Sequence, residues 1–158
     1  MDPNARKKAL RMVSYGLYVA TSPEPDGMAA GTINWITQSS FDPPLIVAGI
    51  KRDSALFRAI ETSRVFAINV VGKSQKAMAI SFFKGGAVEG DRLNGYKMRP
   101  GQTNSAILED APAAFECRAL ETVQRGDHAI FVAEVVAAHV HSDEEPLTLR
   151  EAGFNYAG

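Results

Sequence analysis

The chain has 158 residues, of which 46% are hydrophobic, and this size and composition suit one domain with a sizeable core. Its 17 basic and 18 acidic residues nearly cancel, which argues against a nucleic acid or an anionic membrane as partner. The single cysteine, Cys117, excludes an intrachain disulfide and favours a cytoplasmic location, and no apolar run approaches the roughly 20 residues of a membrane helix. We therefore expect residues 1–158 to form one soluble domain.

The N-terminal part predicts a short helix followed by strands. Pro3 opens the helix, and Leu10 and Val13 are the residues expected to dock it. Residues 15–22 are rich in aromatic and β-branched side chains and precede the turn-forming PEPDG, which predicts a strand and a hairpin. The next strand is expected from 28 to 37.

Two more strands and two helices are predicted before residue 84. The short apolar runs 45–50 and 65–71 are typical of buried strands. A helix over 53–63 begins with Asp53 or Ser54 as its cap, and a helix over 73–84 begins with Ser74. Both helices place apolar residues on one face: Leu56, Phe57 and Ile60 in the first, Met78 and Phe82 in the second.

The remaining chain predicts a loop and two strands. Residues 84–105 are polar and glycine-rich and should form a long surface loop, either functional or merely mobile. Residues 113–123 alternate, with Cys117 on a buried face and Glu116 on an exposed face, and 128–140 predict a long final strand. Many strands with few helices exclude regular parallel βαβ units and favour a mainly β, antiparallel barrel or sandwich.

Common cofactor and catalytic motifs are absent from the sequence. It contains no G-x-G-x-x-G and no G-x-x-x-x-G-K-[ST], so it supports neither a Rossmann site nor a P-loop. It also lacks G-x-S-x-G and H-E-x-x-H, the motifs of common hydrolases and zinc proteases.

The segment KRDSALF at 51–57 is a candidate phosphate site. It places Lys51, Arg52 and the Ser54 hydroxyl at a predicted helix start, where free N–H groups attract anions. The alternative is an ordinary capped helix with solvated charges.

The segment GTINWITQSSFDPP is a candidate wall of a binding cleft. In a strand, Trp35 and Thr37 would project on one side and Asn34, Ile36 and Gln38 on the other. Either set mixes apolar bulk with hydrogen-bonding groups, as expected around a flat heteroaromatic ring. The alternative is a strand end in which Trp35 is a core residue.

The histidines and the cysteine have competing interpretations. His139 and His141 share a strand face, but without an evident third ligand we interpret them as surface residues and expect no metal site. Cys117 is interpreted as a packing residue rather than a nucleophile.

Several segments together resemble one protein family. The stretch DGMAAGTINWITQSSFDPPL is similar to the flavin reductase-like family of FMN-binding split β-barrel proteins, although AAG intervenes where family members often keep Asn-Gly nearer the strand. The stretches KKALRMVSYGLYVATS, RVFAINVV, GDHAIFVAEVV and EPLTLREAGFNYAG resemble further family segments in the same order. The resemblance implies a Greek-key, antiparallel split β-barrel with short peripheral helices, and a homodimer that holds FMN near the subunit interface.

The resemblance also implies roles for individual residues. A first group would border the flavin ring and ribityl chain: Asn34, Trp35, Thr37, Gln38, Ser39, Ser40 and Phe41. Lys51, Arg52 and Ser54 would lie near the flavin phosphate. His128 would contact the nicotinamide or influence proton transfer; the alternative is a turn histidine bonded to backbone.

The function implied is hydride transfer from NADH or NADPH to bound FMN, with FAD as an alternative flavin. The reduced flavin would pass its electrons to an acceptor, which includes an acceptor protein or a ferric chelate. A second hypothesis is a flavoredoxin-like electron carrier whose FMN is reduced by a protein partner, and a third is a flavin-storage module.

Overall fold

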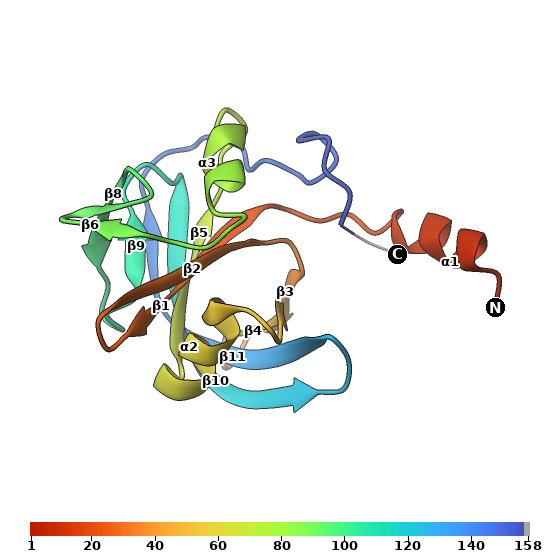
Figure 1. Ribbon diagram of the computed structural model, residues 1–158, viewed down its shortest axis with the longest axis horizontal. Coiled ribbons are helices and arrows are strands. Elements are labelled where there is room, and N and C mark those ends of the chain that lie inside the picture. Colours follow the sequence, from red (N-terminus) through yellow and green to blue (C-terminus); the bar gives the residue numbers. More distant parts are fainter. Residues whose placement is uncertain (157–158) are drawn as a thin grey trace.

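Seven antiparallel strands form one strongly curved sheet in the order β2-β1-β5-β10-β11-β4-β3 (Figure 1). The computed structural model describes residues 1–156 of the chain. The strands of this sheet are β1 (Tyr18–Glu24), β2 (Gly27–Ile33), β3 (Ile36–Ser40), β4 (Leu45–Lys51), β5 (Val65–Val70), β10 (Ala113–Gln124) and β11 (His128–Val140).

The two edge strands of this sheet are consecutive in sequence. β2 ends at Ile33 and β3 begins at Ile36, so only Asn34 and Trp35 join them. The sheet therefore curls until its edges approach each other at this link, without hydrogen bonds that close it. The expectation of a mainly β, antiparallel split barrel is confirmed.

The prediction of one strand from 28 to 37 was wrong. The chain turns at Asn34 and Trp35, and the Trp35 carbonyl accepts a hydrogen bond of 2.8 Å from the Gly49 N–H of β4. The simple alternation expected for residues 34–38 is therefore interrupted. The strand changes neighbours here, from β1 to β4, which local residue patterns do not reveal.

The barrel interior is filled by apolar side chains, and α2 (Ala55–Ser63) packs against it. Ile50, Phe66 and Phe131 are almost fully buried, as are Leu56 and Ile60 of the helix. The helix begins where the sequence predicts: the Ser54 side chain, rather than Asp53, accepts a hydrogen bond from the Phe57 N–H at 3.0 Å. This cap fixes the helix start beside the end of β4.

The other two helices differ from expectation in their contacts. Helix α1 (Pro3–Leu10) extends away from the barrel and buries none of its residues, so the predicted docking through Leu10 and Val13 is not found within the described chain (Figure 1). Helix α3 (Lys76–Ser81) lies over the barrel with Met78 buried. Ser74 does not cap it and instead donates to Glu144 at 2.7 Å.

The loop predicted for 84–105 was wrong, because this segment contains three strands of a second sheet. Its order is β6-β7-β8-β9, with bounds β6 (Val88–Glu89), β7 (Arg92–Leu93), β8 (Tyr96–Pro100) and β9 (Ala106–Leu108). Strands of two residues are too short to carry a periodic pattern. Asn69 of β5 holds this sheet on the barrel, because its side chain accepts from Leu108 N at 2.8 Å and donates to the Ala106 carbonyl at 3.2 Å.

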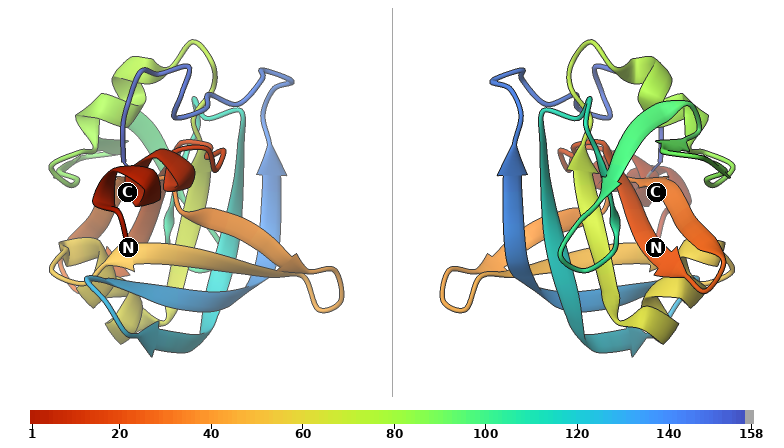
Figure 2. Two further views of the ribbon diagram at one scale, coloured as in Figure 1. Left: turned by 90° about the vertical axis from the view of Figure 1, so that its right-hand side faces the viewer. Right: turned by 90° about the vertical axis from the view of Figure 1, so that its left-hand side faces the viewer.

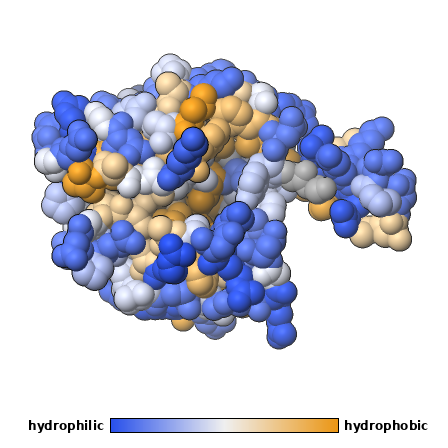
Figure 3. Space-filling model, viewed as in Figure 1, coloured by the Kyte–Doolittle hydropathy of each residue, from blue (hydrophilic) through white to orange (hydrophobic). Residues whose placement is uncertain are grey.

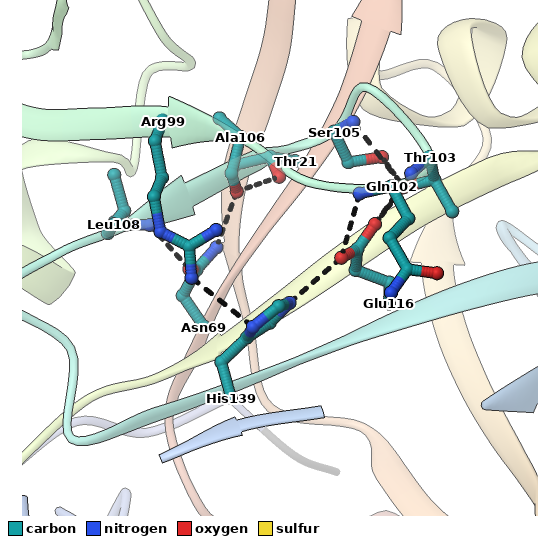
Figure 4. Close-up of polar contacts among 10 residues, drawn as sticks. All are labelled: Thr21, Asn69, Arg99, Gln102, Thr103, Ser105, Ala106, Leu108, Glu116 and His139. Carbon is teal, nitrogen blue, oxygen red and sulfur yellow. Dashed lines mark hydrogen bonds and ion pairs between the residues drawn. The ribbon is translucent and has the colours of Figure 1, made fainter. Parts of the chain in front are cut away.

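Glu116 is fully buried, so the prediction that it lies on an exposed strand face was wrong. Its carboxylate accepts hydrogen bonds from the Gln102 N–H at 3.1 Å, from Thr103 N–H and hydroxyl at 2.7 and 2.8 Å, and from His139 Nε2 at 2.8 Å (Figure 4). Burial by itself raises the pKa of Glu116, but these hydrogen bonds outweigh it and hold the pKa below its ordinary value. A bulge in β10 and the 101–105 turn that covers it bring this about.

His139 is also not the surface residue that was predicted, since 19% of its side chain is exposed. Arg99 Nη2 lies 3.2 Å from its Nδ1, and arginine only donates, so Nδ1 accepts and Nε2 donates to Glu116. His141 is exposed and contacts the Ala111 carbonyl instead. Cys117 is fully buried, and burial, aided by the nearby Glu116 charge, raises the pKa of its thiol to about 12, as suits a packing residue.

Candidate functional site

A cavity of about 860 Å³ opens between β2, the start of α2, the segment after α3 and the C-terminal segment. This volume lies within the range of about 300–1,000 Å³ that is usual for small-molecule sites. The space-filling view shows apolar surface over β2 between hydrophilic residues (Figure 3). The cavity is lined by Leu17, Ala30, Gly31, Thr32, Ile33, Asn34, Gly49, Ile50, Lys51, Asp53, Ser54, Ala55, Leu56, Phe82, Phe83, Lys84, Gly85, His128, Leu149, Gly153, Phe154, Asn155 and Tyr156.

One end of the cavity is suited to an anion. The N-terminus of α2 faces it, and no acceptor among the described residues takes the N–H groups of Ala55 and Leu56. Lys51 from the end of β4 and Lys84 from the segment after α3 add two cations. Free N–H groups, the helix dipole and two ammonium groups together favour a phosphate.

The three residues predicted for the phosphate have different surroundings. Lys51 lines the cavity and pairs with Asp53 at 3.3 Å, so a carboxylate shares this end of the cavity. Ser54 also lines it, but its hydroxyl donates to the Lys51 carbonyl at 2.7 Å and accepts from the helix, so its proton is already committed. Arg52 does not line it and donates to the Gly126 carbonyl at 3.1 Å.

His128 lies at the start of β11, next to Lys51 of β4, and both of its ring nitrogens are hydrogen-bonded. The β4–β11 ladder pairs Lys51 directly with His128, so both side chains leave the same face. His128 Nδ1 is 3.0 Å from an Asp127 carboxylate oxygen and Nε2 is 3.0 Å from the Tyr156 hydroxyl. Both of these partners are side chains rather than backbone groups, and His128 lines the cavity.

The Asp127 carboxylate sets the hydrogen-bond direction at one of the two ring nitrogens of His128. The hydrogen bond from His128 lowers the pKa of Asp127, so this carboxylate accepts and Nδ1–H donates. Burial raises the pKa of Tyr156; the Lys51 charge opposes this shift, and Asp127 and Asp53 add to it. Tyr156 therefore stays protonated near neutral pH, and its hydroxyl is hydrogen-bonded to the imidazole Nε2 at 3.0 Å.

Trp35 lies behind His128 and does not line the cavity. Its ring centroid is 4.5 Å from that of His128 and 5.6 Å from that of Tyr156. A methyl group at Gly49 would lie 3.2 Å from Trp35 Cβ, so glycine permits this packing. Trp35 Nε1 is buried with no hydrogen-bond partner in the described chain. This placement agrees better with the alternative interpretation, in which Trp35 is a core residue, than with Trp35 as part of the cleft wall.

Asn34 is the residue of the 34–41 segment that lines the cavity. It is buried, and its side-chain amide donates to the Tyr156 carbonyl at 3.3 Å. Its amide therefore links the β2–β3 connection to the C-terminal segment that forms the opposite wall.

The other predicted flavin contacts lie on β3 and its turn. The β3–β4 hairpin projects from the barrel (Figure 2). Its side chains bond locally, as in the contact of 3.2 Å from Gln38 Nε2 to the Ser40 carbonyl, and Phe41 is 89% exposed. The cavity of this chain is not lined by Thr37, Gln38, Ser39, Ser40 or Phe41, and their contacts with flavin remain predictions.

Several cavity residues carried no recognised signal in the sequence. Lys84 falls in the segment predicted as a loop. Tyr156 falls in a C-terminal stretch for which the family resemblance was the only basis of a prediction. The C-terminal stretch returns to the cavity because Leu147 N donates to the Val71 carbonyl at 2.8 Å and Leu149 N to the Tyr15 carbonyl at 2.9 Å. No local sequence pattern predicts pairing between segments that lie so far apart in the chain.

The residues present fit FMN. The anion-binding end suits its phosphate, the glycine and apolar residues of β2 and β4 leave a wall for a flat ring, and Asn34 and His128 supply polar groups near that wall. When bound, FMN supplies hydride and electron transfer, and the chain supplies its binding and orientation.

Comparison with known proteins agrees with this site. Residues 10–158 match the family described as "Flavin reductase like domain". A Rhizobium meliloti (strain 1021) protein named "Probable flavin reductase" is 32% identical over 137 residues, which cover 86% of this chain and 43% of that protein. The Agrobacterium fabrum protein "FMN reductase (NADH) SmoA" is 28% identical over 94% of this chain and 82% of its own length.

A solved structure supports the same conclusion. The styrene monooxygenase flavin reductase SMOB from Pseudomonas putida S12 superposes with a TM-score of 0.76 at 26% identity, over 93% of this chain and 91% of that one. This chain spans less than half the length of the first relatives it matches, 43% and 26%. The match over nearly all of its length shows that the chain belongs to the flavin reductase-like family.

Proposed function

We propose that this protein binds FMN in the 860 Å³ cavity and reduces it with NADH or NADPH. The observation that carries the proposal is a single cavity with an anion-binding end beside Lys51 and a histidine held by two side chains in the same wall. The names of relatives, such as "FMN reductase (NADH) SmoA", support nicotinamide as the donor and FMN as the flavin.

In this proposal the residues of the site bind and orient the flavin and the nicotinamide and form no covalent bond with them. Lys51, Lys84 and the N–H groups at the start of α2 hold the flavin phosphate. The Ser54 hydroxyl acts indirectly, because it fixes the helix start whose N–H groups bind the phosphate. Asn34 lies at the wall for the ring, and residues 37–41 would contact the flavin only after the hairpin or a second chain approaches.

His128 is proposed to meet the nicotinamide or to move a proton at reduced flavin. Asp127 and Tyr156 hold its ring in one orientation, with the Nδ1–H directed to the Asp127 carboxylate. A fixed ring at the cavity wall limits the positions open to a second ring, which favours close approach of donor and acceptor.

We also propose that residues 1–158 form one domain, that the protein is a homodimer, and that it acts in the cytoplasm. The support for a dimer is the exposed apolar surface on two projecting elements, with Phe41 89% and Met12 68% exposed. The buried reduced thiol of Cys117 suits a reducing compartment. No helix in the described part of the chain is long and apolar enough to cross a membrane.

The test is an anaerobic visible absorption spectrum of the protein with FMN, followed by titration with NADH and then NADPH. Loss of the oxidised-flavin band on addition of either nucleotide supports the reductase and identifies its donor, with dithionite as the measure of full reduction. Bound flavin that dithionite but neither nucleotide reduces supports the electron carrier or storage hypothesis. Failure to bind FMN or FAD refutes all three.

A further inference from the structure

One wall of the 860 Å³ cavity is formed by the segment 81–87, which runs from the end of α3 to the start of β6. Four of its residues line the cavity: Phe82, Phe83, Lys84 and Gly85. Phe82 is fully buried, and its carbonyl accepts from the Thr32 N–H of β2 at 3.3 Å. Phe83 and Lys84 are exposed, so their placement depends on what holds the rest of the segment.

Asn94 holds the segment on both sides of Phe83 and Lys84, although Asn94 does not itself line the cavity. Its side-chain Nδ2 donates to the Ser81 carbonyl at 2.9 Å and to the Gly85 carbonyl at 2.9 Å. Its Oδ1 accepts from the Ala87 N–H at 2.8 Å. A single side-chain amide therefore fixes the path of the chain before and after the exposed residues.

An asparagine suits this position for two reasons. Its amide offers two N–H donors and one carbonyl acceptor, and here they meet two backbone carbonyls and one backbone N–H. Asn94 and Gly95 also form the two-residue turn between β7 and β8, with φ values of +50° and +84°. Asparagine and glycine are the residues that adopt this left-handed region most readily.

The segment presents a cation without a partner in the described part of the chain. The Lys84 ammonium lines the cavity and contacts no acceptor among residues 1–156. Lys51, the other cation at the anion-binding end, is paired with Asp53 at 3.3 Å. An unpaired ammonium contributes most to binding when its backbone is already held, because less conformational entropy is then lost.

We propose that Asn94 is a positioning residue that holds segment 81–87 so that Lys84 meets the flavin phosphate, and that it thereby favours phosphorylated flavins over riboflavin. This inference rests on the proposed function and deepens it. Asn94 acts through Lys84, since it lies outside the cavity lining. Riboflavin has the same ring and ribityl chain as FMN but offers Lys84 no phosphate, so its binding does not depend on this contact.

The test is a double-variant cycle. The Kd values of FMN and of riboflavin are measured by fluorescence titration in wild type, Asn94→Gly, Lys84→Gln and the double variant. Glycine keeps the positive φ of the turn and the backbone hydrogen bond from residue 94 to the Ala87 carbonyl, and removes the side-chain contacts. Each single variant should weaken FMN binding by about three- to tenfold and leave riboflavin binding near wild type. The double variant should bind FMN no more weakly than Lys84→Gln alone, because the two residues act as one unit.

The matched control is Asn104→Gly. Asn104 also has a positive φ, of +60°, but it lies in the 101–105 turn and does not line the cavity. Its replacement should leave the affinities for both flavins at their wild-type values, and circular dichroism checks that each variant is folded.

A second measurement needs only the wild-type protein. Amide hydrogen exchange is followed at the Ala87 N–H, which Asn94 holds, with saturating FMN and with saturating riboflavin. If Lys84 binds the phosphate from a segment held by Asn94, FMN should slow this exchange more than riboflavin does, because the two contacts stabilise each other.

The inference is overturned by unchanged FMN affinity in folded Asn94→Gly, by equal losses for riboflavin, or by additive losses in the double variant. Equal protection of the Ala87 N–H by the two flavins also overturns it, as does an equal loss in Asn104→Gly. In these cases the proposed function is decided separately, by whether NADH or NADPH reduces FMN in the wild type. A wild-type protein that binds neither flavin ends the proposed function and this inference together.

Discussion

Asp53 should weaken FMN binding in the wild-type protein, and its replacement by asparagine should strengthen it. Its carboxylate lines the anion-binding end and lies 3.3 Å from Lys51 Nζ, where it competes with a phosphate for the same ammonium group. Asp53→Asn removes this negative charge and leaves the Ser54 cap unchanged, because the cap bond comes from Ser54 itself.

The magnitude follows from the geometry of the pair. Coulomb's law at 3.3 Å gives about 1.3 kcal/mol in water. The two side chains are 55% and 73% exposed, so solvent and salt reduce the effect to about 0.5–1 kcal/mol. Asp53→Asn should therefore bind FMN roughly two- to fivefold more tightly.

The assay is fluorescence titration of FMN and, separately, of riboflavin, which lacks the phosphate. Only FMN affinity should rise, and the gain should shrink as salt is added. Asp26→Asn in the β1–β2 turn, outside the cavity lining, is the matched control. Unchanged or weaker FMN binding in folded Asp53→Asn, or an equal gain for riboflavin, would refute the placement of the phosphate at this end.

Four further predictions concern other residues. Lys51→Ala combined with Ser54→Ala should weaken FMN binding by tenfold or more, because the double variant loses roughly one charged contact to the phosphate and the cap that fixes the helix start. Fluorescence titrations with FMN and with riboflavin measure this loss, which should be confined to FMN. His128→Ala should slow flavin reduction by NADH in stopped flow and leave the Kd of FMN near wild type; lost binding without a slower rate would make His128 structural. Gly49→Ala should shift the fluorescence of Trp35, the only tryptophan, and cost about 1–3 kcal/mol of unfolding free energy, because its methyl would lie 3.2 Å from that ring. The pKa of Glu116 is lower in the folded state, so its ionisation stabilises the fold above the unfolded pKa of about 4.3, and this contribution is lost as the pH falls. Melting curves from pH 3 to 7 should therefore show a smaller acid-induced fall in Tm for Glu116→Gln than for the wild type. Parallel pH dependences of Tm in the two proteins would contradict this.

The sequence by itself determined the features that depend on residues close to one another in the chain. The final strand was predicted at 128–140 and found at the same residues, because its apolar pattern repeats locally. The start of this helix was predicted with Asp53 or Ser54 as its cap, because a cap depends only on residues of the first helical turn, and the structure selects Ser54. The local segments KRDSALF and GTINWITQSSFDPP singled out Lys51, Ser54 and Asn34, which line one cavity, whereas Arg52 does not. The family resemblance added His128.

Only the tertiary structure decided features that depend on contacts between distant segments. The strand break at Asn34 and Trp35 requires Gly49 on the neighbouring strand, and the burial of Glu116 requires the 101–105 turn and His139. The hydrogen bond between Tyr156 and His128 joins residues 28 positions apart, and no local sequence pattern around either residue predicts the contact. Periodicity reports which face of a segment is apolar; it does not report which segment covers that face, because burial and hydrogen bonding are properties of the packed pair.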